Sequence, residues 1–323
     1  MQSVKSKEEF FKLQEKLEFV PFAQSKGWHN YMSSKNNDIV YFVDSLEDVK
    51  IALWGRVTTM IFGYSILRVD GESYSKDINE KLFKKFYSAL TKLSFIGLEI
   101  NSGNFYNIDY EVGLRRAGFK RPLSFFSCPL TINIDLQVDF KFDNNWKRNV
   151  KKAISSKLKF REIKIPTVLD LNAIVKLFSE MAKIKNLNFS LEAKHLDVLI
   201  NSNDIRTFIV YKDETPITAR IIYVNKPLAC DIYAANGVEA RNHGASYFIM
   251  QRILEQLKEE GYQSFDFGRI PPSNHNTDSV YNFKNSSRGL KVQYNGEWVF
   301  YKNIFHEYIV HFFKSFIQKS QRY

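Results

Sequence analysis

Cysteine is scarce in this sequence, with only Cys128 and Cys230 among 323 residues. Two distant cysteines provide neither a disulfide framework nor the paired spacing of a zinc site, and they suit a reducing compartment. The six histidines have no metal-binding spacing such as H-E-x-x-H, and no G-x-S-x-G nucleophile motif occurs. We therefore expect chemistry that needs no metal and no permanently bound cofactor.

Long apolar runs are also missing. No window approaches the roughly 20 apolar residues of a membrane-spanning helix, and the N-terminal residues lack the apolar core of a signal peptide. These absences predict a cytoplasmic protein, either soluble or peripheral to the inner face of the membrane.

The residues that are present indicate a folded, basic protein. Hydrophobic residues make up 44% and aromatic residues 15%, which excludes a disordered chain. The net charge is +11, and residues 151–323 hold 25 Lys and Arg against 17 Asp and Glu. Such a basic half suits a polyanion such as RNA, a nucleotide-linked substrate or an anionic membrane surface, although a solvated lysine-rich surface would look the same.

Hydrophobic periodicity predicts an α/β unit in the first half of the chain. The expected helices and strands are helix 5–18, strands 39–43, 49–54 and 58–68, helix 78–93, strand 95–100, helix 109–117 and extended residues 124–135. The chain length favours two domains, and the polar stretch 139–145 is the expected boundary. The predicted domains are therefore residues 1–143 and 144–323.

The second half follows a similar plan. We expect helices at 146–156, 168–185, 191–201 and 245–260, and strands at 159–165, 205–211, 215–224, 228–235, 264–268 and 296–301. The fold class is thus α/β, with a mixed sheet flanked by helices in each of two halves. Two similar halves indicate an internal duplication.

A loop between a predicted strand and a predicted helix could bind an anion. It contains Arg241, Asn242, His243 and Gly244. Backbone N–H groups at a helix start point outward, and the helix dipole favours negative charge. The pattern Arg241-x-x-Gly244-x-Ser246 resembles the loop by which GNAT acyltransferases hold the pyrophosphate of coenzyme A, although glycines at helix starts also occur as plain turn residues.

A second candidate site follows the predicted strand 264–268. The strand carries Asp266 and runs into a polar turn that begins at Arg269. The chain then reaches a lysine flanked by aromatic residues, Tyr281-Asn282-Phe283-Lys284. Asp266 could orient one of the cations or simply cap the turn.

These motifs occur in the order seen in the Fem family, which comprises peptidoglycan-bridge aminoacyltransferases and their relatives. The shared segments are Gln24-Ser25-x-x-Trp28, the helix start at 148–153, the 233–244 loop, Phe265-Asp266-Phe267-Gly268 and Tyr281-x-Phe283-Lys284. The resemblance spans roughly residues 20–300. It implies two tandem GNAT-like domains and the transfer of an aminoacyl group from its tRNA ester to an amine of a cell-envelope precursor.

The resemblance also implies roles for individual residues. Lys284 matches the catalytic lysine of the family, and a fixed cation would stabilise the oxyanion of the tetrahedral intermediate, with Asp266 beside it. We expect the donor to contact Phe283, Tyr281, Arg269 and the loop from Arg241 to Gly244. Phe283 could stack on a terminal adenosine or line an acyl pocket.

The acceptor side departs from the family pattern. We expect Trp28, Tyr233, Lys183 and Lys185 to bind the acceptor, but no second tryptophan follows Trp28 closely. A muropeptide acceptor is one hypothesis, and an amino sugar of a surface polysaccharide is the rival.

Two further segments point to large partners. Eight cations and one acid occur between Lys147 and Lys164, and Lys147, Arg148, Lys151 and Lys152 place like charges at i and i+4, which favours a polyanion opposite. Residues 303–319 form an amphipathic pattern that suits either docking on its own domain or contact with a membrane interface.

Three functions remain open from the sequence. Aminoacyl-tRNA is the leading donor, acyl-coenzyme A or an acyl carrier is the rival donor for N-acylation of a nucleotide-linked amino sugar, and a non-catalytic RNA-binding or membrane-binding protein is the third. The acceptor would be a nucleotide-linked or lipid-linked glycan or peptide.

Overall fold

The structure is a computed structural model that describes residues 1–60, 63–123, 127–185, 191–270, 272, 279–310 and 312. The chain forms two compact units. The first comprises Met1–Pro129 with Gln293–Tyr323, and the second comprises Leu130–Val292.

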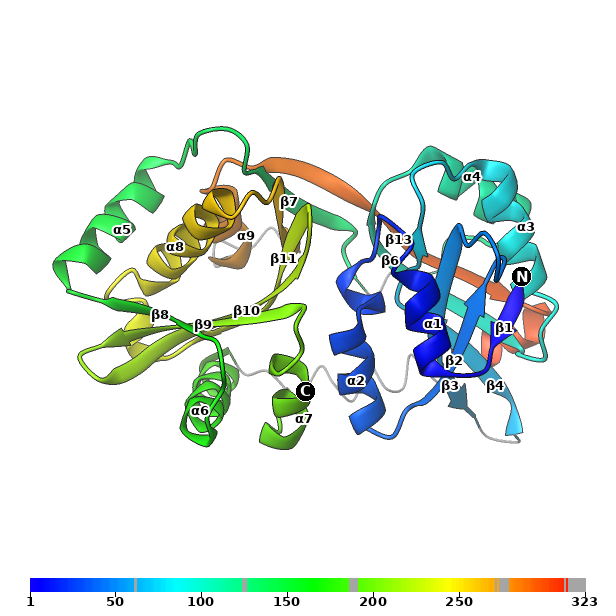
Figure 1. Cartoon of the computed structure of the whole chain (residues 1–323), viewed down its shortest axis with the longest axis horizontal. Coiled ribbons are helices and arrows are strands. Elements are labelled where there is room, and N and C mark those ends of the chain that lie inside the picture. Colours follow the sequence, from blue (N-terminus) through cyan, green and yellow to red (C-terminus); the bar gives the residue numbers. More distant parts are fainter. Residues whose placement is uncertain are drawn as a thin grey trace. The chain divides into compact units, whose positions relative to one another are not determined.

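The first unit contains a mixed sheet with helices. Its strands follow the order β1 (Gln2–Val4), β2 (Asp38–Val43), β3 (Ile51–Thr59), β4 (Ser65–Val69), β6 (Gly97–Phe105) and β13 (Leu290–Tyr301), while β5 (Ser73–Tyr74) pairs with β3. Only β4 and β6 run parallel among the pairs described. The helices are α1 (Lys7–Gln14), α2 (Lys26–Ser34), α3 (Glu80–Leu90) and α4 (Ile108–Arg116), with a 3-10 turn at Phe22–Gln24 (Figure 1).

Local sequence explains why α3 forms where it does. The Asn79 side chain accepts hydrogen bonds from the first backbone N–H groups of the helix, which have no partner within it. Phe83, Phe86, Tyr87 and Leu90 recur at helical spacing and are buried. The aromatic face of α3 therefore anchors the helix in the core of the first unit.

The second unit has the same kind of architecture. Its sheet order is β7 (Leu130–Asp135), β12 (Ser264–Arg269), β11 (Leu228–Asn236), β10 (Thr215–Asn225), β9 (Ile205–Lys212) and β8 (Lys159–Ile163). Helices α5 (Asn144–Ser155), α8 (Ala245–Glu259) and α9 (Ser279–Asn285) cover one face, and α6 (Val168–Lys185) and α7 (Ala193–Ile200) cover the other (Figure 1). A 3-10 turn at Val238–Ala240 precedes α8.

The predicted α/β class is confirmed, and most predicted helices and strands occur near their expected positions. One predicted strand is wrong: residues 58–68 contain the end of β3 and most of β4, joined by a short connection. Two helices were not predicted. They are α2, which contains Trp28, and α9, which contains Lys284.

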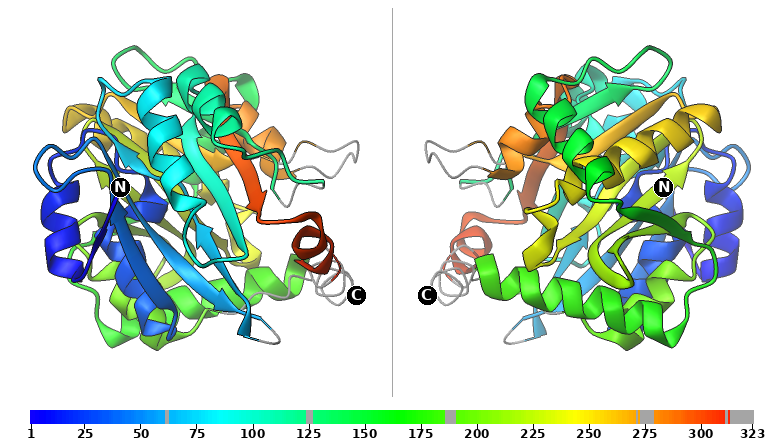
Figure 2. Two further views of the ribbon diagram at one scale, coloured as in Figure 1. Left: turned by 90° about the vertical axis from the view of Figure 1, so that its right-hand side faces the viewer. Right: turned by 90° about the vertical axis from the view of Figure 1, so that its left-hand side faces the viewer.

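The two units differ from the predicted ranges 1–143 and 144–323. The strand β7 pairs with β12 in the second unit, so the second unit starts before the polar stretch at 139–145. The chain then returns to the first unit through β13, which pairs with β6 from Tyr294 to Tyr301. The C-terminal segment consequently belongs to the first unit rather than the second (Figure 2).

A buried carboxyl group lies in the core of the first unit. Glu72 is fully buried and accepts hydrogen bonds from the Tyr87 hydroxyl at 2.7 Å and from the Asn104 side-chain amide at 3.0 Å. Burial nevertheless raises the pKa of Glu72, because desolvation outweighs the effect of these donors. The stability contributed by its protonated form is therefore complete below the unfolded pKa and is lost as the pH rises through the folded value.

We predict that Glu72→Gln stabilises the protein relative to wild type at pH 8, and has less effect at pH 5. Glutamine keeps an acceptor for Tyr87 without a buried charge. Urea unfolding at both pH values measures the difference, with the exposed Glu47→Gln as control. A wild type that is the more stable of the two at pH 8 would contradict the prediction.

Candidate functional site

Two neighbouring parallel strands separate in the middle of the second sheet. The pairing of β11 with β12 covers Leu228 with Ser264, Ala229 with Phe265 and Cys230 with Asp266. Beyond Cys230, β11 continues beside β10, while the end of β12 stays with β7 through Arg269 and Thr131. Beyond this point the two strands are not paired by backbone hydrogen bonds. A substrate can therefore approach the backbone groups of both strands here.

Gly268 lies at the separation point and needs to be glycine. Its φ of +70° is in the left-handed region. A Cβ there would also lie 3.0 Å from the carbonyl oxygen of Asp231 on β11. The register of β12 with β7 shifts between Asp266 and Arg269, so a local irregularity turns the end of β12 away from β11.

The Lys284 side chain is buried at this strand end. Its Nζ donates hydrogen bonds to the carbonyl oxygens of Phe267 at 2.6 Å, Arg269 at 3.0 Å and Gly268 at 3.3 Å. An ammonium group has three N–H donors, so these bonds tie α9 to the end of β12. A fixed positive charge therefore lies where the two strands part.

Other buried charges surround this ammonium group. Arg220 on β10 and Asp231 on β11 form an ion pair at 2.5 Å, and both side chains are at least 94% buried. Burial lowers the pKa of Lys284, an effect opposed chiefly by the negative charge of Asp231. Burial likewise raises the pKa of Asp231, opposed by Arg220 and Lys284. The Asp231 Oδ1 and the Arg220 Nε are both buried and have no hydrogen-bond partner among the described residues.

Asp266 performs the capping role that was one of its two predicted alternatives. Its Oδ1 accepts hydrogen bonds from the Thr131 hydroxyl at 2.5 Å and from the Gly268 backbone N–H at 2.8 Å. Asp266 therefore stabilises the irregular backbone conformation at the end of β12. Its charge also raises the pKa of Lys284, after the larger effects of burial, Asp231 and Arg220. Its predicted catalytic role stays a prediction.

Phe283 is embedded in an aromatic cluster. Its ring stacks on Trp146 of α5 at 5.5 Å between centroids and meets Tyr247 of α8 edge-on at 4.9 Å. The Arg220 guanidinium lies 5.3 Å from the centre of the same ring. Much of the ring surface is thus occupied by packing that positions the neighbouring Lys284, and the predicted contact of Phe283 with the donor stays a prediction.

Tyr281 and Arg269, the other predicted donor contacts near Lys284, are half-buried. The Lys291 ammonium lies 5.7 Å from the centre of the Tyr281 ring. Arg269 contributes its carbonyl oxygen to Lys284 and pairs with Thr131 through its backbone. Both residues therefore belong to the elements that hold the candidate catalytic lysine, and their contact with the donor stays a prediction.

The predicted anion-binding loop lies at the start of α8. Gly244 has φ +65° and is the N-cap of α8, which receives no side-chain cap. Arg241 and Asn242 are exposed, whereas the His243 Nδ1 lies 3.0 Å from the Ser156 hydroxyl at the end of α5. A Cβ on Gly244 would lie 2.3 Å from the Asn149 carbonyl oxygen, so α5 packs closely against this loop.

The four cations predicted to bind a polyanion share the exposed surface of α5. Lys147, Arg148, Lys151 and Lys152 are all exposed. The ion pairs among the described residues include none of them, and Arg148 donates only to the neutral Asn145 side chain. α5 therefore presents positive charge that no carboxylate in the described part of the chain neutralises.

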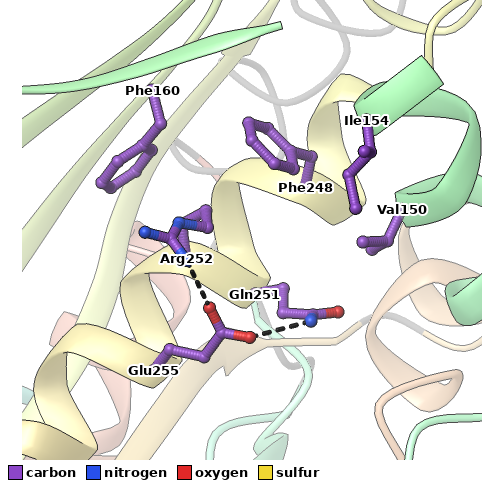
Figure 3. Close-up of a pocket in the computed structure, with 7 residues that line it drawn as sticks. All are labelled: Val150, Ile154, Phe160, Phe248, Gln251, Arg252 and Glu255. Atoms are coloured by element: carbon purple, nitrogen blue, oxygen red, sulfur yellow. Dashed lines mark hydrogen bonds and ion pairs between the residues drawn. The ribbon is translucent and has the colours of Figure 1, made fainter. Parts of the chain in front are cut away.

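An open groove of about 440 Å³ lies between α5, α8 and β8. Val150, Ile154, Phe160 and Phe248 supply its apolar wall (Figure 3). Its polar side is Gln251, Glu255 and Arg252, where Glu255 accepts hydrogen bonds from the other two. These polar groups satisfy one another, so the groove shows no charge directed at a ligand.

The predicted acceptor residues belong to separate elements, and their role stays a prediction. Tyr233 on β11 contacts Phe178 of α6, on the other face of the sheet from α8, and Lys183 is exposed on α6. The side chain of Lys185 lies outside the described residues. Trp28 belongs to the first unit, where its ring stacks on Tyr31 at 4.9 Å and approaches Phe22 at 4.8 Å.

The Arg220–Asp231 pair is the feature that sequence reasoning missed. A signal for it existed, because each residue interrupts a largely apolar predicted strand, 215–224 and 228–235. Charges of opposite sign on adjacent strands are seldom buried unless they pair. Burial raises the pKa of the Cys230 thiol, which disfavours its nucleophilic thiolate form.

Comparison with known proteins agrees with this architecture. Residues 191–285 match the family described as acetyltransferase (GNAT) domain. The crystal structure of FemX superposes with a TM-score of 0.75 at 10% identity, covering 94% of this chain and 98% of that chain. The chain has a tandem GNAT fold. The predicted resemblance to the Fem family is confirmed at the level of the fold.

Other solved structures are also similar. A tandem GNAT protein from the clavulanic acid pathway has a TM-score of 0.52 at 11% identity, covering 93% of this chain and 98% of that one. The C-terminal domain of a putative lysylphosphatidylglycerol synthetase from Agrobacterium fabrum reaches 0.63 at 14% identity, with 93% and 92% covered. A search of curated protein sequences finds no match.

We predict that Gly244→Ala lowers the free energy of unfolding by roughly 2–4 kcal/mol, because it combines a left-handed backbone with a clash against Asn149. The control is Gly261→Ala just beyond the other end of α8. Gly261 also has a positive φ, +82°, but no atom lies within 4 Å of its added Cβ.

Gly261→Ala should therefore lower the free energy of unfolding by only about 1 kcal/mol, because only the left-handed backbone conformation is unfavourable for alanine there. Denaturant unfolding of the two variants measures both effects. Equal destabilisation would contradict the close approach of α5 to the α8 loop.

Proposed function

We propose that this protein transfers an aminoacyl group from aminoacyl-tRNA to an amine of a cell-envelope precursor. The observation that carries the proposal is the buried ammonium group of Lys284 at the point where β11 and β12 part in a GNAT domain. The similarity to FemX supports it through the shared fold. The reaction requires no metal.

The proposed chemistry is attack by a neutral amine on an ester carbonyl. The amine forms the new C–N bond, the carbonyl oxygen becomes an oxyanion, and collapse of the intermediate breaks the ester C–O bond. The proton lost by the amine ends on the departing ribose hydroxyl. Lys284 supplies a preorganised cation for the oxyanion, and its longest hydrogen bond, to Gly268, is the one most readily exchanged.

The α5 surface supports tRNA as the donor. Four exposed cations without carboxylate partners provide phosphate contacts along a helix, as a nucleic acid backbone requires. In addition, α5 packs against Gly244 and His243, and so occupies one side of the loop that would hold the pyrophosphate of coenzyme A. Both features favour a large polyanion over a single nucleotide.

Acyl-coenzyme A or an acyl carrier remains the second candidate donor. It is favoured by the exposed Arg241 and by the uncapped N-terminus of α8, which is a usual place for a phosphate. The acceptor under either proposal is an amine of a peptidoglycan precursor or of a surface-polysaccharide amino sugar, linked to a nucleotide or a lipid. The reaction would take place in the cytoplasm of a bacterium.

We predict that Lys284→Met lowers kcat for aminoacyl transfer by roughly 100- to 1,000-fold, because a preorganised charge at the oxyanion is lost. Transfer of a radiolabelled amino acid from charged tRNA to envelope precursors measures the rate. The control is Lys176→Met, an exposed lysine of the same unit. A thermal melt separates loss of the hydrogen bonds to β12 from loss of catalysis.

A Lys284→Met variant that remains folded and transfers at the wild-type rate would refute the oxyanion role. Ribonuclease treatment of the donor mixture separates the two donors. Activity that survives ribonuclease and requires acyl-coenzyme A would replace tRNA with the second candidate. A protein inactive with both donors would be the non-catalytic RNA-binding or membrane-binding alternative.

We also predict that Lys147→Gln/Lys151→Gln weakens tRNA binding and reduces the slope of log Kd against log salt concentration by about one per lysine. The matched control is Lys176→Gln/Lys194→Gln, which removes two exposed lysines from α6 and α7. Fluorescence anisotropy with labelled tRNA over a salt series provides both numbers. Identical slopes for the two double variants would place the RNA elsewhere.

A further inference from the structure

The C-terminal part of the first unit carries a helix with two different faces. Residues 304–310 are helical and follow β13 (Figure 2). One face docks on the unit: the buried Val310 packs with Ile66 and Ile96. Glu307, also buried, forms an ion pair with Lys120 at 2.6 Å. These contacts fix which side of the helix faces solvent.

The outward face is apolar. Ile304 is 67% exposed, Phe305 is 65% exposed and Tyr308 is 60% exposed. With about 100° of rotation per residue, these three side chains lie within about 100° of arc, on the side opposite Val310. Large apolar side chains gathered on an exposed face usually mark a contact with another surface.

A second element extends this face. Tyr64 directly precedes β4. Tyr64 is 41% exposed, and its ring lies 5.5 Å from the ring of His306 on the helix. We name Tyr64, Ile304, Phe305 and Tyr308 the C-terminal apolar patch.

The charge of the sequence that carries the patch favours one kind of partner. Residues 302–323 contain Lys302, Lys314, Lys319 and Arg322 but only one acid, Glu307, which already pairs with Lys120. A symmetric contact between two copies of the chain would bring these like charges together. An anionic bilayer instead attracts them, and its interface accommodates tyrosine and phenylalanine rings.

We propose that the C-terminal apolar patch binds the interface of an anionic lipid bilayer. The contact is peripheral, since no helix within the described ranges is long and apolar enough to cross a membrane. This proposal does not depend on the transfer reaction. It would place the catalytic unit near acceptors that are carried on lipids.

The test is sedimentation of the full chain with vesicles of phosphatidylcholine, with and without one quarter phosphatidylglycerol. We expect wild type to bind the anionic vesicles, with weaker binding at high salt. Ile304→Ser/Phe305→Ser should lower the partition coefficient at least 10-fold. The matched control, Ile165→Ser/Leu169→Ser, removes two apolar side chains of the second unit that are 82% and 80% exposed, and should bind as wild type does.

Because all four substituted side chains are exposed, both double variants should keep the wild-type melting temperature. Wild type that fails to bind anionic vesicles would overturn the proposal, as would equal binding by the two double variants. Sedimentation velocity provides the remaining outcome. A wild-type dimer that Ile304→Ser/Phe305→Ser dissociates, without vesicle binding, would assign the patch to a second copy of the chain.

Discussion

A buried ammonium group governs the structure of the second unit. Lys284 needs compensation for its lost hydration, and three carbonyl oxygens at the end of β12 provide it. Those carbonyls point at Lys284 only because β12 bends away from β11, which requires Gly268 and the cap from Asp266. The neighbouring Arg220–Asp231 pair extends the same network of buried charges.

The same constraint connects the fold to the proposed chemistry. A buried cation that two carbonyl oxygens keep in place has to exchange only its longest hydrogen bond, to Gly268, when an oxyanion forms, so it stabilises the transition state at little cost of reorganisation. The rings of Phe283 and Trp146 stack on each other, so α9 packs against α5. The helix that positions the lysine is thereby packed against the helix that carries the unneutralised surface cations.

The sequence predicted the α/β class, most helices and strands and the position of the key lysine, because these depend on local periodicity and motif spacing. It did not predict α9, which is short and follows a polar stretch of sequence, or the return of β13 to the first unit, which depends on distant pairing. The Arg220–Asp231 pair was missed because partners on adjacent strands become visible only with the register. Roles for Trp28 and Tyr233 cannot follow from motifs alone, since the two lie in different units.

The central claim is that Lys284 serves a site for an aminoacyl ester on RNA. The most direct measurement is binding of a tRNA acceptor-stem minihelix that carries its amino acid through a stable amide, compared with the uncharged minihelix. The account predicts tighter binding of the charged form by wild type, and loss of that difference in Lys284→Met while the uncharged minihelix binds both equally. Equal binding of the charged and uncharged forms by wild type, with coenzyme A displacing neither, would contradict it.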